Sequence, residues 1–204
     1  MMTSIRKPVS MIASGVFMLA AAMPMAATAG DQPLPPRAPD LAQADQPAGT
    51  VFNYLFIAGA TFHPLESATA FAYSGAGCIH KTGGSGNLFA HKVVLPEGAV
   101  VHYLRLYFFD TSTEKVTAFF TTYDAAGGFN ELTSVSSTND AGGFASTLSP
   151  EISYTVDNFS APINLVANLG AQNNNTLRFC GMRIAYEPPV LDTIFKDGFD
   201  PQPL

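Results

Sequence analysis

The sequence predicts an all-β protein, an antiparallel two-sheet β-sandwich of one domain with a jelly-roll-like arrangement. Apolar side chains alternate with a period of two, which is typical of strands that bury one face. Turn-forming residues recur about every 8 to 12 residues, as expected for a sandwich. After residue 29 no window has the pattern of an amphipathic helix, and 16 Phe and 7 Tyr among many Thr and Ser favour pleated strands.

The clearest strand is predicted from Ala99 to Phe109, after a turn at residues 96–98. Its buried face is expected to hold Val100, Leu104, Leu106 and Phe108. Its other face is expected to hold Tyr103, Arg105 and Tyr107. This alternation predicts that one side of the strand packs in the core and the other side is accessible.

A hairpin is predicted to follow this strand. Residues 110–113 are turn formers, and they lead into a second alternating segment from Lys115 to Tyr123. Val116, Ala118 and Phe120 form its apolar side. Two alternating segments joined by a short polar turn indicate antiparallel neighbours.

The remaining strands are predicted on both sides of this pair, separated by Gly, Pro, Asn and Asp clusters. One of these clusters, Gly83 to Gly86, is interpreted as a flexible turn. The predicted strands are Val51–Ala58, Ala70–Tyr73, Leu88–Leu95, Phe129–Ser136, Ile152–Val156, Ile163–Leu169 and Thr176–Tyr186.

The first 29 residues are predicted to be a cleaved secretory signal. Arg6 and Lys7 precede an apolar run from Met11 to Met25, and the small residues of Ala27-Thr28-Ala29 end it. An uncleaved membrane anchor is the alternative, but the run is short of the about 20 residues that a span needs. Cleavage near Ala29 predicts a protein that is secreted, periplasmic or on the cell surface of a bacterium.

Three further segments follow the signal. Residues 30–49 contain five prolines and little to bury, so they are predicted to form an extended linker. Residues 50–188 have the length of one domain and are assigned to the sandwich. Residues 189–204 are assigned to a C-terminal tail. No membrane span is expected in the mature chain.

The charge balance argues against nucleic acid as a partner. The signal carries two of the ten basic residues and none of the 16 acidic ones, so its removal changes the net charge from −6 to −8. Nucleic-acid binding relies on clustered Lys and Arg, which this chain lacks.

The cysteine pair is predicted to be a disulfide. Cys78 and Cys180 are the only cysteines, and two cysteines in an exported protein usually pair. Cys180 is expected to share the inward face of the last strand with Met182 and Ile184. A redox role would need a second nearby thiol and an activating charge, which the sequence does not offer.

Catalytic and metal signatures are weak. His63, His80, His91 and His102 have no metal-binding spacing and are interpreted as core or rim residues, and neither an HExxH nor a GxSxG motif is present. No cofactor is expected. Calcium stays open because acidic residues lie at predicted turns, although Asp is also a common turn residue. These residues are Asp110, Glu114, Asp124, Asp140 and Asp157.

A candidate ligand platform lies on the polar face of the strongest strand. Tyr103 and Tyr107 flank Arg105 on this face. Two tyrosines beside a cation suit the stacking of a sugar ring, although the chain has no Trp. The alternative is that both tyrosines cover a neighbouring strand or the sheet edge.

The tail contains the short segment IFKDGFD at residues 194–200. Its motif residues are Ile194, Phe195, Asp197, Gly198, Phe199 and Asp200. It resembles the IFxDGF(E/D) tail that closes many otherwise unrelated exported proteins of certain gram-negative bacteria. The resemblance implies a tag that docks to a sorting receptor; a tail folded back on the body is the alternative. The body resembles uncharacterised exported bacterial β-sandwich proteins, and this likeness assigns no site.

Together these observations predict an exported, non-enzymatic binding or surface-interaction module. A glycan or another envelope protein is the expected partner. A structural component of the cell envelope and a secreted hydrolase are the alternatives.

Overall fold

The computed structural model describes residues 51–75, 77–138 and 141–189. The predicted signal (1–29), the linker (30–49) and the tail motif (Ile194 to Asp200) lie outside these ranges, as does Asp140. Within them no helix is both long enough and apolar enough to cross a membrane.

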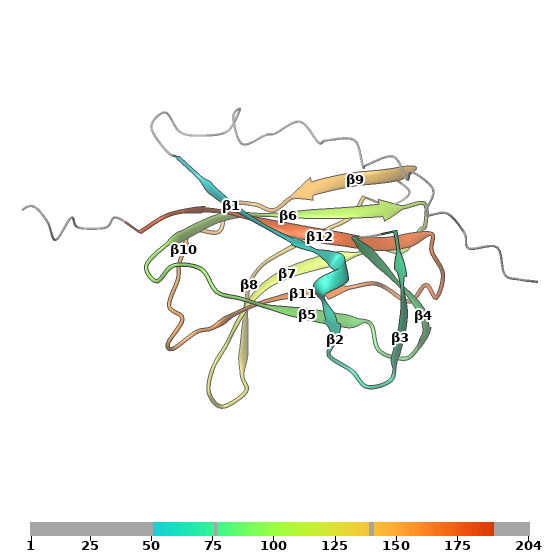
Figure 1. Ribbon diagram of the computed structural model, residues 1–204, viewed down its shortest axis with the longest axis horizontal. Helices are drawn as coiled ribbons and strands as arrows, with labels where there is room; N and C mark the ends of the chain where they lie inside the picture. The colour runs from blue at the N-terminus through green and yellow to red at the C-terminus, as the bar shows by residue number, and fades with distance from the viewer. Residues whose placement is uncertain (1–50, 76, 139–140, 190–204) are drawn as a thin grey trace, which may run out of the picture. The chain divides into compact units, whose positions relative to one another are not determined.

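Two antiparallel sheets form a sandwich, as predicted (Figure 1). One sheet has seven strands: β1 (Asn53–Ala58), β3 (Thr69–Ser74), β4 (Cys78–Gly84), β6 (Val100–Asp110), β9 (Gly143–Leu148), β10 (Tyr154–Thr155) and β12 (Leu177–Glu187). The other has five: β2 (His63–Pro64), β5 (Leu88–Val93), β7 (Thr117–Tyr123), β8 (Phe129–Ser136) and β11 (Ile163–Asn168). One turn of 3-10 helix, η2 (Gly59–Thr61), follows β1.

The order of the strands is jelly-roll-like. Among the described strands, consecutive ones lie in the same sheet only at β3–β4, β7–β8 and β9–β10, and every other connection crosses the sandwich. In the seven-stranded sheet β12 has β6 along one edge and β1 and β4 along the other. The far edge of β6 pairs with β9 and β10.

The core lies between the two sheets. Leu104, Leu106 and Phe108 of β6 are at most 1% exposed, which confirms the predicted inward face over this part of the strand. From the facing sheet Val116, Ala118 and Phe120 are fully buried, also as predicted. Alternating apolar residues on the two strands therefore meet across the sandwich, which is why their pattern was readable in the sequence.

The predicted hairpin between residues 99 and 123 is wrong. β6 pairs with β12, β9 and β10, whereas β7 pairs with β8 and β11 in the other sheet. The connection crosses the sandwich, and Asp110, at its start, is fully buried and bonds residues on both sides of the crossing. Its carboxylate accepts hydrogen bonds from the backbone N–H of Ser112 at 2.9 Å and from the hydroxyl of Ser137 at 2.6 Å.

Two bulges correct the predicted faces of β6 and β12. In the pairing of these strands Tyr103 opposes Ala185 and Val101 opposes Tyr186, so His102 is an extra residue. Its insertion changes the alternation, and Val101 rather than Val100 is buried.

The second bulge lies at Cys180, between the paired residues Phe179 and Gly181. Phe179 and Met182 point into the core, and Cys180 therefore does not follow the inward alternation that the sequence predicted. As the extra residue it bonds Cys78 on β4, with the two sulfurs 2.01 Å apart. The predicted disulfide is thus present. It joins two neighbouring strands through cysteines that are 102 residues apart in the sequence.

Strands β4 and β9 were absent from the prediction, and part of a predicted turn is strand. β4 continues through Gly83 to Gly84 and pairs with β3. β9, of sequence GFASTL, pairs with β6 along six residues. The end of β4 and much of β9 consist of glycine and small polar residues, which are typical of turns and do not indicate a strand.

Candidate functional site

The outer face of the seven-stranded sheet gathers aromatic rings and arginines from four adjacent strands. We call this surface the aromatic–arginine face. Cross-strand pairing defines its rows, because paired residues share a face of the sheet. Its members are Tyr54 and Phe56 of β1, Arg178 and Arg183 of β12, Tyr103, Arg105, Tyr107 and Phe109 of β6, and Phe144 of β9.

Alternation within each strand places these side chains outside. On β1, Tyr54 and Phe56 alternate with Leu55 and Ile57, and Ile57 is only 8% exposed. Tyr54 and Phe56 are 42% and 54% exposed, which is unusual for large rings on a sheet face. β1 therefore contributes the most accessible part of the face.

Gly181 provides the space in which two rings meet. It opposes Ala58 on β1 and Tyr107 on β6, with φ at +138°. A Cβ at this position would lie 2.4 Å from the carbonyl oxygen of Ile57 and 3.1 Å from the ring of Phe56. The missing side chain lets the rings of Phe56 and Tyr107 pack edge to face, with centroids 5.5 Å apart.

The arginines stack on the rings of the face. The guanidinium carbon of Arg183 lies 4.9 Å from the ring centre of Tyr54 and 6.0 Å from that of Tyr107. Arg178 lies 4.3 Å from the ring centre of Phe109, which in turn packs against Phe144 at 5.0 Å. Such cation–π contacts hold each guanidinium beside its ring and limit its movement on the sheet.

The predicted platform of Tyr103, Arg105 and Tyr107 lies within this face, but its arginine is not on the surface. Both tyrosines are half-buried, whereas Arg105 is only 4% exposed. Its Nη1 donates to the hydroxyl of Ser146 at 3.1 Å, and its buried Nε has no partner. Arg105 lies directly opposite Arg183 in the pairing of β6 with β12.

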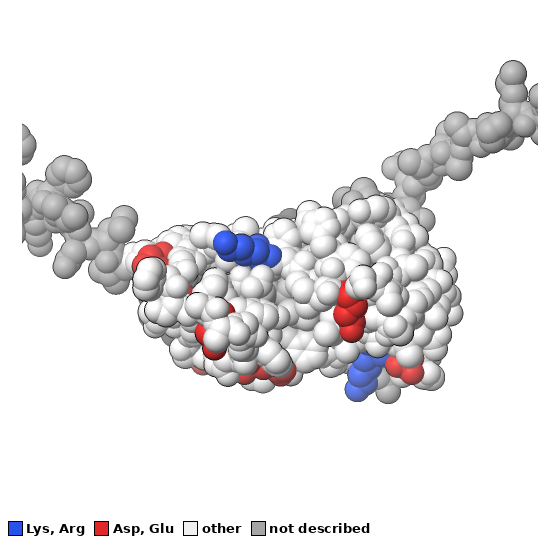
Figure 2. All heavy atoms as spheres, turned by 90° about the horizontal axis from the view of Figure 1, so that it is seen from below, with Lys and Arg blue, Asp and Glu red and all other residues white. Residues whose placement is uncertain are grey.

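Between their ends, the four strands of the face carry arginines as their only charged residues. Arg105, Arg178 and Arg183 are the only arginines in the described part of the chain. The four strands of the face contain two acidic residues, Asp110 and Glu187, both at strand ends. By contrast, the molecule seen from below in Figure 2 shows a mostly uncharged surface with scattered acidic and basic side chains.

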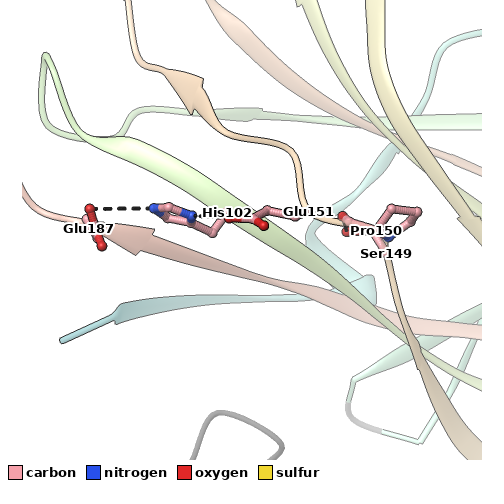
Figure 3. A network of polar contacts seen from close by, with 5 residues as sticks. All are labelled: His102, Ser149, Pro150, Glu151 and Glu187. Carbon is pink, nitrogen blue, oxygen red and sulfur yellow. Dashed lines mark hydrogen bonds and ion pairs between the residues drawn. The ribbon is translucent and has the colours of Figure 1, made fainter. Parts of the chain in front are cut away.

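One end of the face carries a histidine between two carboxylates (Figure 3). His102 Nδ1 lies 3.1 Å from Glu151, and its Nε2 lies 3.6 Å from Glu187. The rings of Phe52 and Tyr103 pack beside it, at 5.0 and 6.3 Å. The imidazole of His102 thus lies between Glu187, at the end of β12, and Glu151, in the segment before β10.

The other three histidines lie on separate strands. His63 is exposed on β2, and His91 on β5 contacts the carbonyl oxygen of Thr61 at 3.0 Å. His80 on β4 contacts the hydroxyl of Ser74 at 2.6 Å. In the described ranges no three His, Cys, Asp or Glu side chains form a group that could hold a metal ion.

The acidic residues predicted at turns have local partners. Asp124 accepts hydrogen bonds from the backbone N–H groups of Ala126 and Gly128, and Asp157 accepts them from Phe159 and Ser160. These bonds hold the pKa of Asp157 below its usual value, with Ser160 making the largest contribution. The carboxylates therefore stabilise the turns themselves.

We expect His80 to reduce stability at mildly acidic pH. Burial, and to a smaller extent the charge of Arg178, lower the pKa of His80 from 6.5. As the pH falls below 6.5, the unfolded chain takes up a proton at this position before the folded chain does. The contribution of His80 to stability is therefore fully present above pH 6.5 and is lost as the pH falls toward the pKa of the folded state. His80→Gln should therefore flatten the fall in Tm between about pH 7.5 and 5. Exposed His63→Gln is the control, and equal slopes in wild type and His80→Gln would contradict the assignment.

A concave surface lies on the outside of the five-stranded sheet. It is a hollow of about 230 Å³ with mostly apolar walls and one carboxylate, that of Glu131. Phe129 at its edge is 69% exposed. The lining residues are Leu65, Leu88, Phe119, Thr121, Tyr123, Phe129, Glu131 and Val166.

Sequence reasoning found three of the nine members of the aromatic–arginine face. The others were visible as alternation, since Tyr54 and Phe56 alternate with apolar residues and Arg183 stands between Met182 and Ile184. What the sequence lacked was the pairing, because no local signal states that β1, β12, β6 and β9 are neighbours.

The fold defines the class of this protein as an antiparallel two-sheet β-sandwich, and no protein-family model and no curated protein matches the chain. Among solved structures, one similar chain is the CBM36-1 domain of a multidomain xylanase from the hindgut metagenome of Trinervitermes trinervoides. The two are 8% identical with a TM-score of 0.43, and the match covers 65% of this chain and 96% of the other.

Another similar chain is the C-terminal CBM6 of LamC, a marine laminarinase from Zobellia galactanivorans, with 14% identity, a TM-score of 0.42 and coverage of 65% and 98%. An exo-beta-1,3-galactanase from Phanerochaete chrysosporium is 15% identical, with a TM-score of 0.40 and coverage of 71% and 31%. Likenesses of this degree carry no argument about what this chain binds.

Proposed function

We propose that this protein is an exported, non-enzymatic carbohydrate-binding module whose ligand lies on the aromatic–arginine face. The observation that carries the proposal is the cluster of Tyr54, Phe56, Tyr103 and Tyr107 around Arg183 on one accessible sheet face. Rings packed edge to face and guanidinium groups stacked on them leave a firm surface with both apolar and hydrogen-bonding parts.

A sugar ring suits such a surface. Its C–H faces pack on aromatic side chains, while its hydroxyls need donors and acceptors nearby, which tyrosine hydroxyls and arginine N–H groups supply. Little side-chain entropy is lost on binding, because the rings are already packed against each other.

The non-enzymatic part of the proposal is supported by what surrounds the rings. The carboxylates of β1, β6, β9 and β12, those of Asp110 and Glu187, lie at strand ends, and the one imidazole, His102, lies at the end of the face beside Glu187. Acid–base or nucleophilic chemistry usually needs such groups within hydrogen-bond reach of the substrate. Export rests on the signal predicted at residues 1–29, and the sorting role of the tail motif remains a prediction.

We expect Tyr107→Ala to weaken glycan binding by about tenfold or more, because it removes the central ring and the support of Phe56. Tyr107→Phe should keep most of the affinity, since it keeps the ring. Tyr103→Ala should also weaken binding. A glycan array with the mature protein identifies the ligand, and calorimetry with that ligand gives the affinities.

Phe129→Ala is the matched control because it removes an exposed ring from the hollow on the other sheet. Each variant is melted to show that it is folded. Loss of binding in Phe129→Ala with full binding in Tyr107→Ala would move the site to the five-stranded sheet. A folded protein that binds no glycan and instead self-assembles would favour the structural role.

A further inference from the structure

We propose that the hollow on the five-stranded sheet binds a small organic ammonium ion of about the size of choline. The ion lies between the rings of Tyr123 and Phe129 and the carboxylate of Glu131, all of which line the hollow. The aromatic–arginine face belongs to the other sheet, so this inference is independent of the proposed function.

The register of β7 with β8 brings the two rings and the carboxylate together. Tyr123 opposes Phe129, and Thr121 opposes Glu131, and paired residues share a face of the sheet. Leu132 is the extra residue of a bulge at this point and packs against the core, while Glu131 stays on the outer face. Two residues along a strand cover about 7 Å, so one cation can contact both the rings and the carboxylate.

The rings form a corner that a cation can enter. The ring centroids of Tyr123 and Phe129 are 6.2 Å apart and their planes are tilted by 38°, so neither ring stacks on the other. Phe129 is 69% exposed, and the ring of Phe119 adds a third aromatic wall. The face of an aromatic ring attracts a cation that lies within about 6 Å of its centre.

The polar groups of the hollow favour a cation over a sugar. Thr121 donates its hydroxyl hydrogen to the carbonyl oxygen of Asn164 at 2.6 Å, so this hydrogen is not available to a ligand. Besides Glu131 and the hydroxyl of Tyr123, the other lining residues have apolar side chains. A sugar needs several donors and acceptors, whereas a quaternary ammonium group needs negative charge and apolar contact.

The charges around the hollow also favour a cation. No cation of the described chain forms an ion pair with Glu131. The row of paired residues that begins at Glu131 reaches a lysine only at Lys92, three strands and about 14 Å away. Asp124 follows Tyr123 directly, and the chain has a net charge of −6. This negative surrounding attracts a cation and repels an anion.

The size of the hollow limits the ligand. Its volume of about 230 Å³ is below the range of about 300 to 1,000 Å³ that is typical of pockets for drug-sized molecules. A single ammonium group with its methyl substituents fits this space, and an oligosaccharide does not. The hollow therefore suits a small free cation.

Choline and its neutral isostere, the alcohol in which carbon replaces the nitrogen, test the inference by NMR titration of the mature protein. We expect saturable shifts at Tyr123 and Phe129, with choline bound about tenfold or more tightly than the isostere. The difference should shrink as salt is raised, because Glu131 is exposed. Equal binding of the two compounds, or no saturable binding of choline, would overturn the inference.

Variants with matched controls assign the site. Glu131→Gln should weaken choline binding about tenfold, whereas Glu114→Gln, at the opposite end of β7, should not change it. Tyr123→Ala should abolish saturable binding and Tyr123→Phe should keep it. Melting curves show whether each variant is folded, and Phe129→Ala replaces Tyr123→Ala if the latter is not. An equal loss in the two glutamate variants would show a diffuse charge effect and would overturn the assigned site.

Lys196→Gln tests whether the tail of the chain itself occupies the hollow, because Lys196 is the cation of the segment IFKDGFD. Unchanged choline binding in this variant supports a free ligand. Tighter binding would assign the hollow to the tail and overturn the inference. Failure of choline binding leaves the aromatic–arginine face untouched, and loss of glycan binding in Tyr107→Ala leaves the hollow untouched, so the two proposals fail separately.

Discussion

The double variant Cys78→Ala/Cys180→Ala is expected to unfold at a Tm about 10 °C below that of the wild type. The bridge closes a loop of 102 residues, and in the chain-entropy model a loop of about 100 residues contributes up to about 4.7 kcal/mol, although real bridges often contribute less. It also fastens β4 to the bulge of β12. Calorimetry of both proteins, with and without reductant, measures the effect.

Reductant provides the internal control for this prediction. It should lower the Tm of the wild type to that of the double variant and leave the double variant unchanged. Mass spectrometry of the protein exported by cells should find a mass two hydrogens below that of the reduced chain. Two free thiols in that sample, or a Tm that reductant does not change, would contradict the prediction.

Phe179→Ala is expected to reduce the free energy of unfolding by about 3 to 5 kcal/mol. Phe179 is fully buried on β12 and its ring packs edge to face on Phe62, with centroids 4.7 Å apart. Truncation removes apolar area and leaves a cavity that the facing sheet cannot fill. Urea unfolding followed by fluorescence or circular dichroism measures the change.

Phe159→Ala is the matched control for that substitution. Phe159 is 96% exposed, so the same chemical change should alter stability by no more than about 0.5 kcal/mol. Equal effects of the two substitutions would mean that Phe179 does not form part of the core described above.

The strands were predictable where alternation and turns agree. β8 has the predicted bounds, Phe129 to Ser136, and the buried residues of β7 are those whose period of two was visible. The partners of β6 were not predictable. The turn formers after Asp110 indicate a reversal, but the chain crosses to the opposite sheet, where the hydroxyl of Ser137 donates a buried hydrogen bond to Asp110. That contact joins residues 27 positions apart, beyond the range of turn propensity.

The candidate site was predictable in part for the same reason. Tyr103 and Tyr107 could be placed on one face from the alternation of a single strand. The burial of Arg105 and its position opposite Arg183 depend on the register of β6 with β12, and that register includes a bulge at His102. A bulge shifts a face without leaving a clear mark in the sequence.

The position of β12 has a consequence for the order in which the domain can fold. It is the last strand of the described chain, yet it lies inside the seven-stranded sheet and pairs with β1, β4 and β6. Until it has been synthesised, those three strands lack their common partner and expose open edges, which favour association with other chains. Folding is therefore delayed until synthesis of the domain is nearly complete, and distant pairings make its formation slow. If residues 1–29 act as the predicted export signal, this delay keeps the chain open while it is threaded through a secretion channel.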